Sequence, residues 1–151
     1  MFRGLSVLDN VALVLESTAG RGARRQAAEV LERFSLEGLA GQRASTLSGG
    51  ERRRLELARA VCRDPAVLVC DEPLTGVDPK AASELRELLR SLAADGMGIL
   101  LTDHNVAEAL LACDRASLLV DGRVVVEGTA EDLEESEVAR SLYFGSGGAP
   151  V

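Results

Sequence analysis

Apolar residues in the first part of the chain recur at the spacing of amphipathic helices. Residues 9–17 begin with Asp9 and Asn10, residue types that favour a helix N-terminus. The pattern predicts three helices, over residues 9–17, over residues 22–35 and from after Ser48 to about Cys62. Together these helices predict an all-helical domain over residues 1–64.

The pattern changes after residue 64. Residues 66–70 are a continuous apolar run, which is typical of a buried strand in a parallel sheet. Asp78 and Pro79 predict the start of a helix that ends at Gly96, and a second apolar run follows over residues 99–102. This alternation of strands and helices predicts an α/β core with a parallel sheet over residues 65–128.

The last part of the chain carries turn and cap residues at defined places. A short helix is expected over residues 105–111. Two apolar runs, residues 115–120 and 123–127, are joined by Asp121 and Gly122, which predicts a β-hairpin with a type I′ turn. Thr129 begins a C-terminal helical segment over residues 129–144, and residues 145–151 are expected to be a flexible tail.

Composition narrows the functional class. The 151 residues are 46% hydrophobic and 27% charged, which is ordinary for one globular domain. A net charge of −7 argues against a nucleic-acid partner, because binding to a phosphate backbone normally requires a basic face. Three cysteines without a C-x-x-C pair are expected to be reduced thiols. The chain contains no apolar run long enough to span a membrane.

The first motif with chemical meaning is Ser48-Gly49-Gly50-Glu51 at the start of a predicted helix. Two glycines allow close backbone approach by a ligand, and a helix N-terminus favours an anion. Ser48 and Glu51 also have the spacing of a capping box, so the motif taken alone is explained better by helix capping.

Two further motifs follow the predicted strands. Asp71 and Glu72 end the first strand, where ligand sites of parallel sheets lie, and could hold Mg²⁺ and orient a water. They could also be a pair of solvated acids at a loop. His104, the sole histidine, follows the second strand and is expected beside Glu72, although a lone histidine is more often a packing or surface residue.

The order and spacing of these three motifs resemble those of the ABC transporter ATPase family, over nearly the whole chain from Phe2 to about Phe144. The resemblance implies the P-loop NTPase fold of ABC ATPases in an incomplete form, with the helical signature subdomain and the C-terminal part of the sheet core. It also implies ATP and Mg²⁺ as cofactors, and a second ATPase subunit as head-to-tail partner.

The resemblance assigns roles to single residues. Ser48, Gly49 and Gly50 match the signature motif, which contacts ATP held by the other subunit. Asp71 matches the Mg²⁺ position, and Glu72 and His104 match the catalytic carboxylate and the switch histidine. Asp78 is the last residue of the segment that matches the D-loop, and in the family the D-loop crosses the dimer interface. Many members of the family have glutamine at the position of Glu51, which favours a capping role for this acid.

The subfamily resembled is that of the lipopolysaccharide-export ATPases, with branched-chain amino-acid importer ATPases as the alternative. The implied location is the cytoplasmic face of the bacterial inner membrane. The segment from Phe2 to Asn10 is expected to help receive a coupling helix of the membrane subunits, unless Phe2 merely covers the helical domain. The transported substrate is not readable from this sequence.

One family motif is missing from this sequence. The phosphate-binding loop needs a lysine preceded by glycine, and the sole lysine, Lys80, follows Pro79. Neither Gln26 nor Gln42 ends a predicted strand, so a Q-loop glutamine is missing as well. The chain alone is therefore predicted to be inactive and marginally stable, with unpaired sheet edges. Three interpretations are open: a fragment of a complete ATPase, a non-catalytic module that docks on the membrane subunit or a full-length ATPase, and a decaying gene.

Overall fold

The computed structural model describes residues 1–144, and the predicted flexible tail, residues 145–151, lies outside the described residues. The chain forms two compact units. The first contains residues 1–69 and 76–100, and the second contains residues 70–75 and those from 101 onward. The predicted domain boundaries near residues 64 and 128 follow the sequence pattern and remain predictions.

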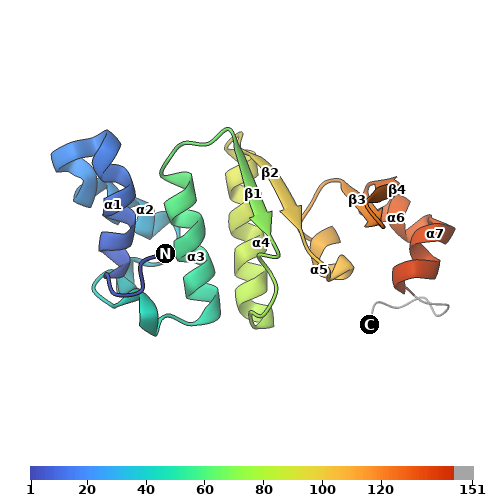
Figure 1. Cartoon of the computed structure of the whole chain (residues 1–151), viewed down its shortest axis with the longest axis horizontal. Coiled ribbons are helices and arrows are strands. Elements are labelled where there is room, and N and C mark those ends of the chain that lie inside the picture. Colours follow the sequence, from blue (N-terminus) through green and yellow to red (C-terminus); the bar gives the residue numbers. More distant parts are fainter. Residues whose placement is uncertain (145–151) are drawn as a thin grey trace. The chain divides into compact units, whose positions relative to one another are not determined.

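Four helices make up most of the first unit (Figure 1). Helix α1 contacts both α2 and α3, and α3 contacts α4. Short 3-10 turns connect the helices of the first half of this unit. The bounds are α1 Val7–Ala19, α2 Ala23–Arg33, α3 Gly49–Val61 and α4 Pro79–Ala94, with 3-10 turns η1 Gly20–Gly22, η2 Glu37–Leu39 and η3 Ala44–Thr46.

Helix α1 begins earlier than predicted. Its N-cap is Ser6, whose hydroxyl accepts a hydrogen bond from the amide of Asp9 at 3.0 Å. The prediction that Asp9 and Asn10 cap this helix is therefore wrong. Asp9 lies in the first turn, where its charge suits the helix dipole, and Asn10 is a fully buried helix residue.

The buried Asn10 ties the N-terminal segment to α1. Its carboxamide oxygen accepts from the amide of Phe2 at 2.8 Å, and its nitrogen donates to the carbonyls of Phe2 and Ser6, each at 2.9 Å. A buried amide is stable only when its polar atoms are paired, and here the segment before the helix supplies the partners.

The helices of the first unit enclose an apolar core. Ala27 and Leu31 of α2 are buried, and so is Phe34 at the C-cap of this helix. Leu55 of α3 and Leu85 of α4 are also buried. Helix α4 begins as predicted, with the Asp78 carboxylate accepting from the amide of Ala81, and it ends before Gly96, whose φ of +96° suits glycine.

Strands β1 (Val67–Asp71) and β2 (Gly98–Thr102) pair with each other. The amide of Gly98 bonds the carbonyl of Ala66, and the amide of Glu72 bonds the carbonyl of Thr102, so the pairing advances in the same direction along both strands and is parallel. The predicted burial of the first strand holds for one face only. Val67 is 58% exposed and Val69 is 65% exposed, because only alternate residues face the packed side.

The second unit contains a hairpin and short helices. The turn residues Asp121 and Gly122 both have positive φ, +49° and +75°, which confirms the predicted two-residue turn. The strands pair antiparallel, with a bulge that places Val125 between the partners of Leu118 and Leu119. The elements are α5 Val106–Leu110, β3 Ala116–Val120, β4 Arg123–Gly128, α6 Ala130–Glu135, α7 Glu137–Ala139 and a final turn η4 Arg140–Phe144.

The strands of the described residues form two separate two-stranded sheets, β1 with β2 and β3 with β4. Among the helices within residues 1–144, none is both long enough and apolar enough to cross a bilayer.

Candidate functional site

Polar side chains gather at the carboxyl ends of β1 and β2. The hydroxyl of Thr102, the last residue of β2, donates to the Asp71 carboxylate at 2.7 Å. Nδ1 of His104 lies 3.1 Å from Oε1 of Glu72, as the sequence predicted from adjacent parallel strands. Both side chains are about half exposed or more, so a ligand can reach them. This end of the sheet holds two carboxylates and an imidazole in one unit of the structure.

Glu72 has an unusual backbone. Its φ is +44°, in the left-handed region that non-glycine residues rarely adopt. Its amide is held by the carbonyl of Thr102 at 2.8 Å, and its carbonyl accepts from the amide of Thr75 at 3.3 Å. Such conformations persist where the surroundings fix them, and they cluster at functional sites. The backbone turn after β1 thus directs the Glu72 side chain to the histidine.

Asp103 shapes the turn that carries the histidine. Its side chain is only 1% exposed, and its Oδ1 accepts from the amide of Asn105 at 2.9 Å. Asn105 in turn caps α5 by accepting from the amide of Glu108. The other oxygen of Asp103 is buried without a hydrogen-bond partner among the described residues. Sequence analysis assigned no role to Asp103, although an aspartate two residues before a helix cap is typical of such turns.

The strand ends fit a magnesium ion that is shared with a phosphate. Within residues 1–144 no cluster of three acids, histidines or cysteines forms a complete metal cage. Mg²⁺ needs no such cage, because it keeps waters and commonly binds one or two carboxylates together with substrate phosphates. The Asp71 carboxylate is exposed and oriented by Thr102, so it can act as the single protein acid for such an ion.

The second group of predicted residues lies at the N-terminus of α3. Ser48 is the N-cap, its hydroxyl accepting from the amide of Glu51 at 3.3 Å. The Glu51 carboxylate accepts from the amide of Ser48 at 2.8 Å, which completes the capping box. The hydrogen bonds from the Ser48 backbone and side chain, helped by the charge of Arg54, lower the pKa of Glu51. Glu51 therefore has the capping role that its acidic character suggested.

The two glycines at this N-terminus have different surroundings. A Cβ atom on Gly49 would lie 3.5 Å from the carbonyl oxygen of Gly76, which is ordinary contact. A Cβ atom on Gly50 would lie 2.6 Å from the Cβ atom of Ala81, which is too close for real atoms. Gly50 is thus required by the packing of α3 on α4, independently of any ligand.

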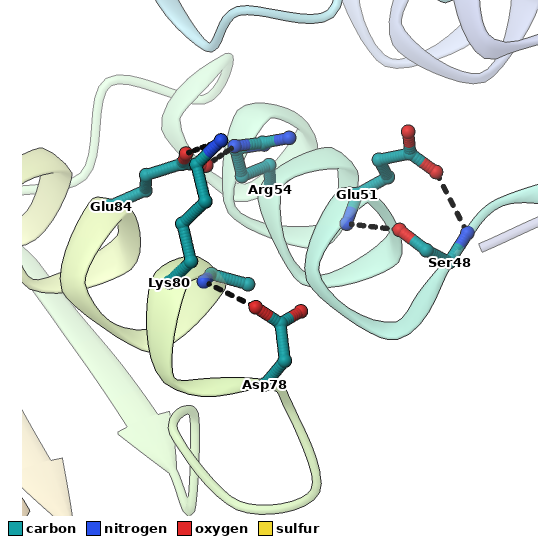
Figure 2. A network of polar contacts seen from close by, with 7 residues as sticks. Ser48, Glu51, Arg54, Asp78, Lys80 and Glu84 are labelled. Atoms are coloured by element: carbon teal, nitrogen blue, oxygen red, sulfur yellow. Dashed lines mark hydrogen bonds and ion pairs between the residues drawn. The ribbon is translucent and has the colours of Figure 1, made fainter.

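Asp78 and the start of α4 lie beside this group (Figure 2). The Asp78 carboxylate accepts from the amide of Ala81 at 3.0 Å. Farther along, Arg54 of α3 forms an ion pair with Glu84 of α4, and Lys80 approaches the same carboxylate at 3.8 Å. The sequence did not predict this pair, because its members are 30 residues apart, with strand β1 between their helices.

A cavity of about 570 Å³ lies between the end of α2, the middle of α3 and α4. Its lining is mostly polar or charged and includes Arg54 and Glu84. Near this region Arg33, at the end of α2, pairs with Asp95, the C-cap of α4.

The predicted site residues therefore form two groups. Asp71, Glu72 and His104 belong to the second unit, while Ser48, Gly49, Gly50 and Asp78 belong to the first. Gln26 lies inside α2 and Gln42 lies between 3-10 turns, so neither ends a strand of the described residues.

The comparisons of this chain with known proteins agree with one another. The family model for ABC transporters matches residues 1–75. A probable ABC transporter ATP-binding protein of Azorhizobium caulinodans is 44% identical over 147 residues, which are 96% of this chain and 52% of that protein. The lipopolysaccharide export system ATP-binding protein LptB of Acidithiobacillus ferridurans is 40% identical over 147 residues, covering 96% of this chain and 61% of that protein.

Solved structures agree with the sequence relatives. The ADP conformation of the cassette MJ1267 superposes with a TM-score of 0.81 at 25% identity, over 95% of this chain and 64% of that one. The dimeric post-hydrolysis state of the cassette MJ0796 with ADP and Pi gives a TM-score of 0.72 at 29% identity, over 85% of this chain and 58% of that one. The chain spans between about half and two thirds of the length of these proteins. In sequence the chain is therefore similar to ATP-binding proteins of ABC transporters, and it has the fold of their P-loop NTPase cassettes.

Proposed function

We propose that the chain is the signature-motif and catalytic part of an ATP-hydrolysing subunit that drives an ABC transporter. The observation that carries this proposal is the contact between Glu72 and His104 at the end of β1, with Asp71 directly beside Glu72. In phosphoryl transfer the protein mainly positions groups, and this end of the sheet positions a carboxylate and an imidazole together.

Each residue at the strand ends has a distinct proposed task. Asp71 would hold Mg²⁺, and this ion would supply charge stabilisation at the phosphates. Glu72 orients the attacking water and accepts its proton. His104 holds the Glu72 carboxylate on one side and faces the γ-phosphate on the other.

The residues of the first unit have a proposed task across a dimer. Ser48, Gly49 and Gly50 contact the γ-phosphate of ATP held by a second ATPase subunit, where the dipole of α3 favours the anion. Asp78 and the residues before it lie at the interface of this head-to-tail pair. The related cassette that was solved as a dimer with ADP and Pi supports this arrangement for the family fold.

The transporter is proposed to be a lipopolysaccharide exporter, which the resemblance to LptB supports. The chain would then work on the cytoplasmic face of the bacterial inner membrane. The N-terminal segment is the proposed contact for a membrane subunit. Phe2 there is 51% exposed, and the guanidinium carbon of Arg59 lies 5.3 Å from the centre of the Phe2 ring, so the ring is held in place while part of it stays exposed.

The test joins this chain to the part of Acidithiobacillus ferridurans LptB that it does not cover. We expect the chimaera to hydrolyse ATP, and the Glu72→Gln variant to lose about 100-fold or more in kcat. Glu127→Gln is the matched control, because Glu127 is an exposed acid of β4 whose ion-pair partner is Arg115. A Glu72→Gln chimaera that turns over as fast as the Glu127→Gln control would refute the proposed role.

The 151-residue chain by itself is expected to show no ATP turnover. It contains no lysine preceded by glycine, and such a lysine, together with the loop amides, is the main anchor for the phosphates. Turnover above background in the purified chain that disappears with Glu72→Gln would contradict this expectation.

A further inference from the structure

The N-termini of α3 and α4 touch at backbone level. The Cβ of Ala81 in α4 occupies the space that a side chain at Gly50 in α3 would need. Gly49 similarly lies next to the carbonyl of Gly76 and the side chain of Val77, the residues that precede α4. Contact this close leaves no room for sliding, because packed atoms resist displacements of a few tenths of an ångström. The two segments that carry the proposed nucleotide contacts of the first unit therefore press directly on each other.

A charged bridge fastens the same two helices one to two turns farther along. The Arg54 side chain is only 17% exposed, and one of its terminal nitrogens bonds the Glu84 carboxylate. Lys80, in the first turn of α4, adds a second positive charge near Glu84. A bridge with a largely buried arginine is shielded from salt and water, so it holds its geometry better than an exposed pair.

Arg54 is also connected to the capping box. It follows Glu51 by three residues on the same helix, and its charge contributes to the lowered pKa of that acid. Hydrogen bonds thus join Ser48 to Glu51, and Arg54, on the next turn of the same helix, joins Glu84 and the first turn of α4 (Figure 2).

The bridge also borders the cavity between α2, α3 and α4. Both Arg54 and Glu84 line the cavity, together with Glu87, Leu88 and Ser91 of the following turns of α4. The two contacts described above, Gly50 with Ala81 and Arg54 with Glu84, both lie in the N-terminal halves of these helices. A joint with this location transmits displacement between the two N-termini.

We propose that α3 and α4 act as one mechanical unit, in which the Arg54–Glu84 bridge and the Gly50–Ala81 contact make the signature segment and the segment before α4 move together. Arg54 and Glu84 are positioning residues in this unit. The meaning for catalysis rests on the proposed function, since both segments would contact nucleotide across a dimer. Coupling of this kind is reciprocal, so a ligand that orders one segment also orders the other.

The test measures amide hydrogen exchange by NMR in the nucleotide-free chain, so that its outcome is independent of ATP hydrolysis. Two amides report on the joint: Arg52, bonded to the carbonyl of Ser48, and Ala82, bonded to the carbonyl of Asp78. Val11, fully buried in α1, reports on global opening. Glu84→Gln is a change on α4, and we expect it to raise the exchange rate at Arg52 on α3 about threefold or more.

Glu56→Gln is the matched control, because Glu56 pairs with Arg53 inside α3 and does not reach α4. It is expected to leave the ratio of Arg52 to Val11 exchange unchanged. The proposal is overturned if Glu84→Gln raises exchange only at Ala82, or if Arg52 and Val11 accelerate by the same factor.

A charge exchange keeps the test decisive if single variants unfold. The double variant Arg54→Glu with Glu84→Arg retains an opposite-charge pair across the helices. Recovery of protection at both Arg52 and Ala82 supports the joint. A folded double variant in which either amide stays as fast as in Glu84→Gln overturns it.

Discussion

The contact between Gly50 and Ala81 gives the sharpest prediction about stability. In Gly50→Ala the new methyl carbon would lie 2.6 Å from the Cβ of Ala81, and that carbon is attached directly to the backbone of α4. Neither atom can rotate away, so relief requires the two helices to separate. Overpacking of this kind typically costs about 1–3 kcal/mol.

A smaller effect opposes this cost. The φ of Gly50 is not positive, so alanine fits its backbone and gains up to about 1 kcal/mol from reduced freedom of the unfolded chain. The expected net loss for Gly50→Ala is therefore about 1–2 kcal/mol of unfolding free energy. Gly49→Ala meets only ordinary contacts, the nearest at 3.5 Å, so its stability should be unchanged or higher by up to about 1 kcal/mol.

The assay is urea unfolding followed by circular dichroism, with the free energy taken from the midpoint and slope. Ala81→Gly removes the methyl group that Gly50→Ala strikes, and alone it costs up to about 1 kcal/mol in helix propensity. In the double variant the two changes should be non-additive by about 1–2 kcal/mol in the favourable direction. Equal stability of Gly50→Ala and Gly49→Ala, or simple additivity in the double variant, would show that the close approach does not constrain the helices.

Three further changes have defined outcomes. Asn10→Leu should lower the unfolding free energy measured in urea by about 2–4 kcal/mol. The hydrogen bonds of the buried carboxamide to Phe2 and Ser6 are lost, and the polar groups of the N-terminal segment stay unpaired. An unchanged urea midpoint would contradict this prediction. Because the pKa of Glu51 is lowered in the folded state, its contribution to stability is present above the unfolded-state pKa and is lost as the pH falls through the folded-state value. Glu51→Gln should therefore flatten the acid limb of a curve of unfolding free energy against pH. An acid limb that Glu51→Gln leaves unchanged would refute this prediction. Gly122→Ala places a side chain at φ +75° and should lower the unfolding free energy by about 1 kcal/mol. A thermal midpoint that does not decrease would contradict this prediction.

The sequence predicts the elements and the strand-end group well, because both depend on local patterns. Alternation of apolar runs and caps locates β1, β2 and α4, and parallel neighbours necessarily bring the residues after their ends together. Glu72 and His104 lie 3.1 Å apart for this reason. Adjacent motifs on adjacent strands are the part of a site that sequence can place.

The sequence fails where a polar residue has more than one use. Asn10 is a frequent helix cap, but in this chain it is buried and pairs with the preceding segment, so the cap falls to Ser6. The role of Arg54 depends on a helix 30 residues away, and one arginine in a run of three carries no local mark of its partner. The exposure of Val67 was missed for a similar reason, since an apolar run does not reveal whether both faces of its strand are covered.

The left-handed backbone of Glu72 sets a limit on how this protein can change. A glycine or asparagine would adopt that conformation more easily, so mutants selected for thermal resistance should drift toward these residues at this position. The proposed hydrolytic role would be lost in every such mutant. Glu72 carries both the strained backbone and the proposed catalytic carboxylate. A substitution that stabilises the protein at this position would therefore remove ATP turnover.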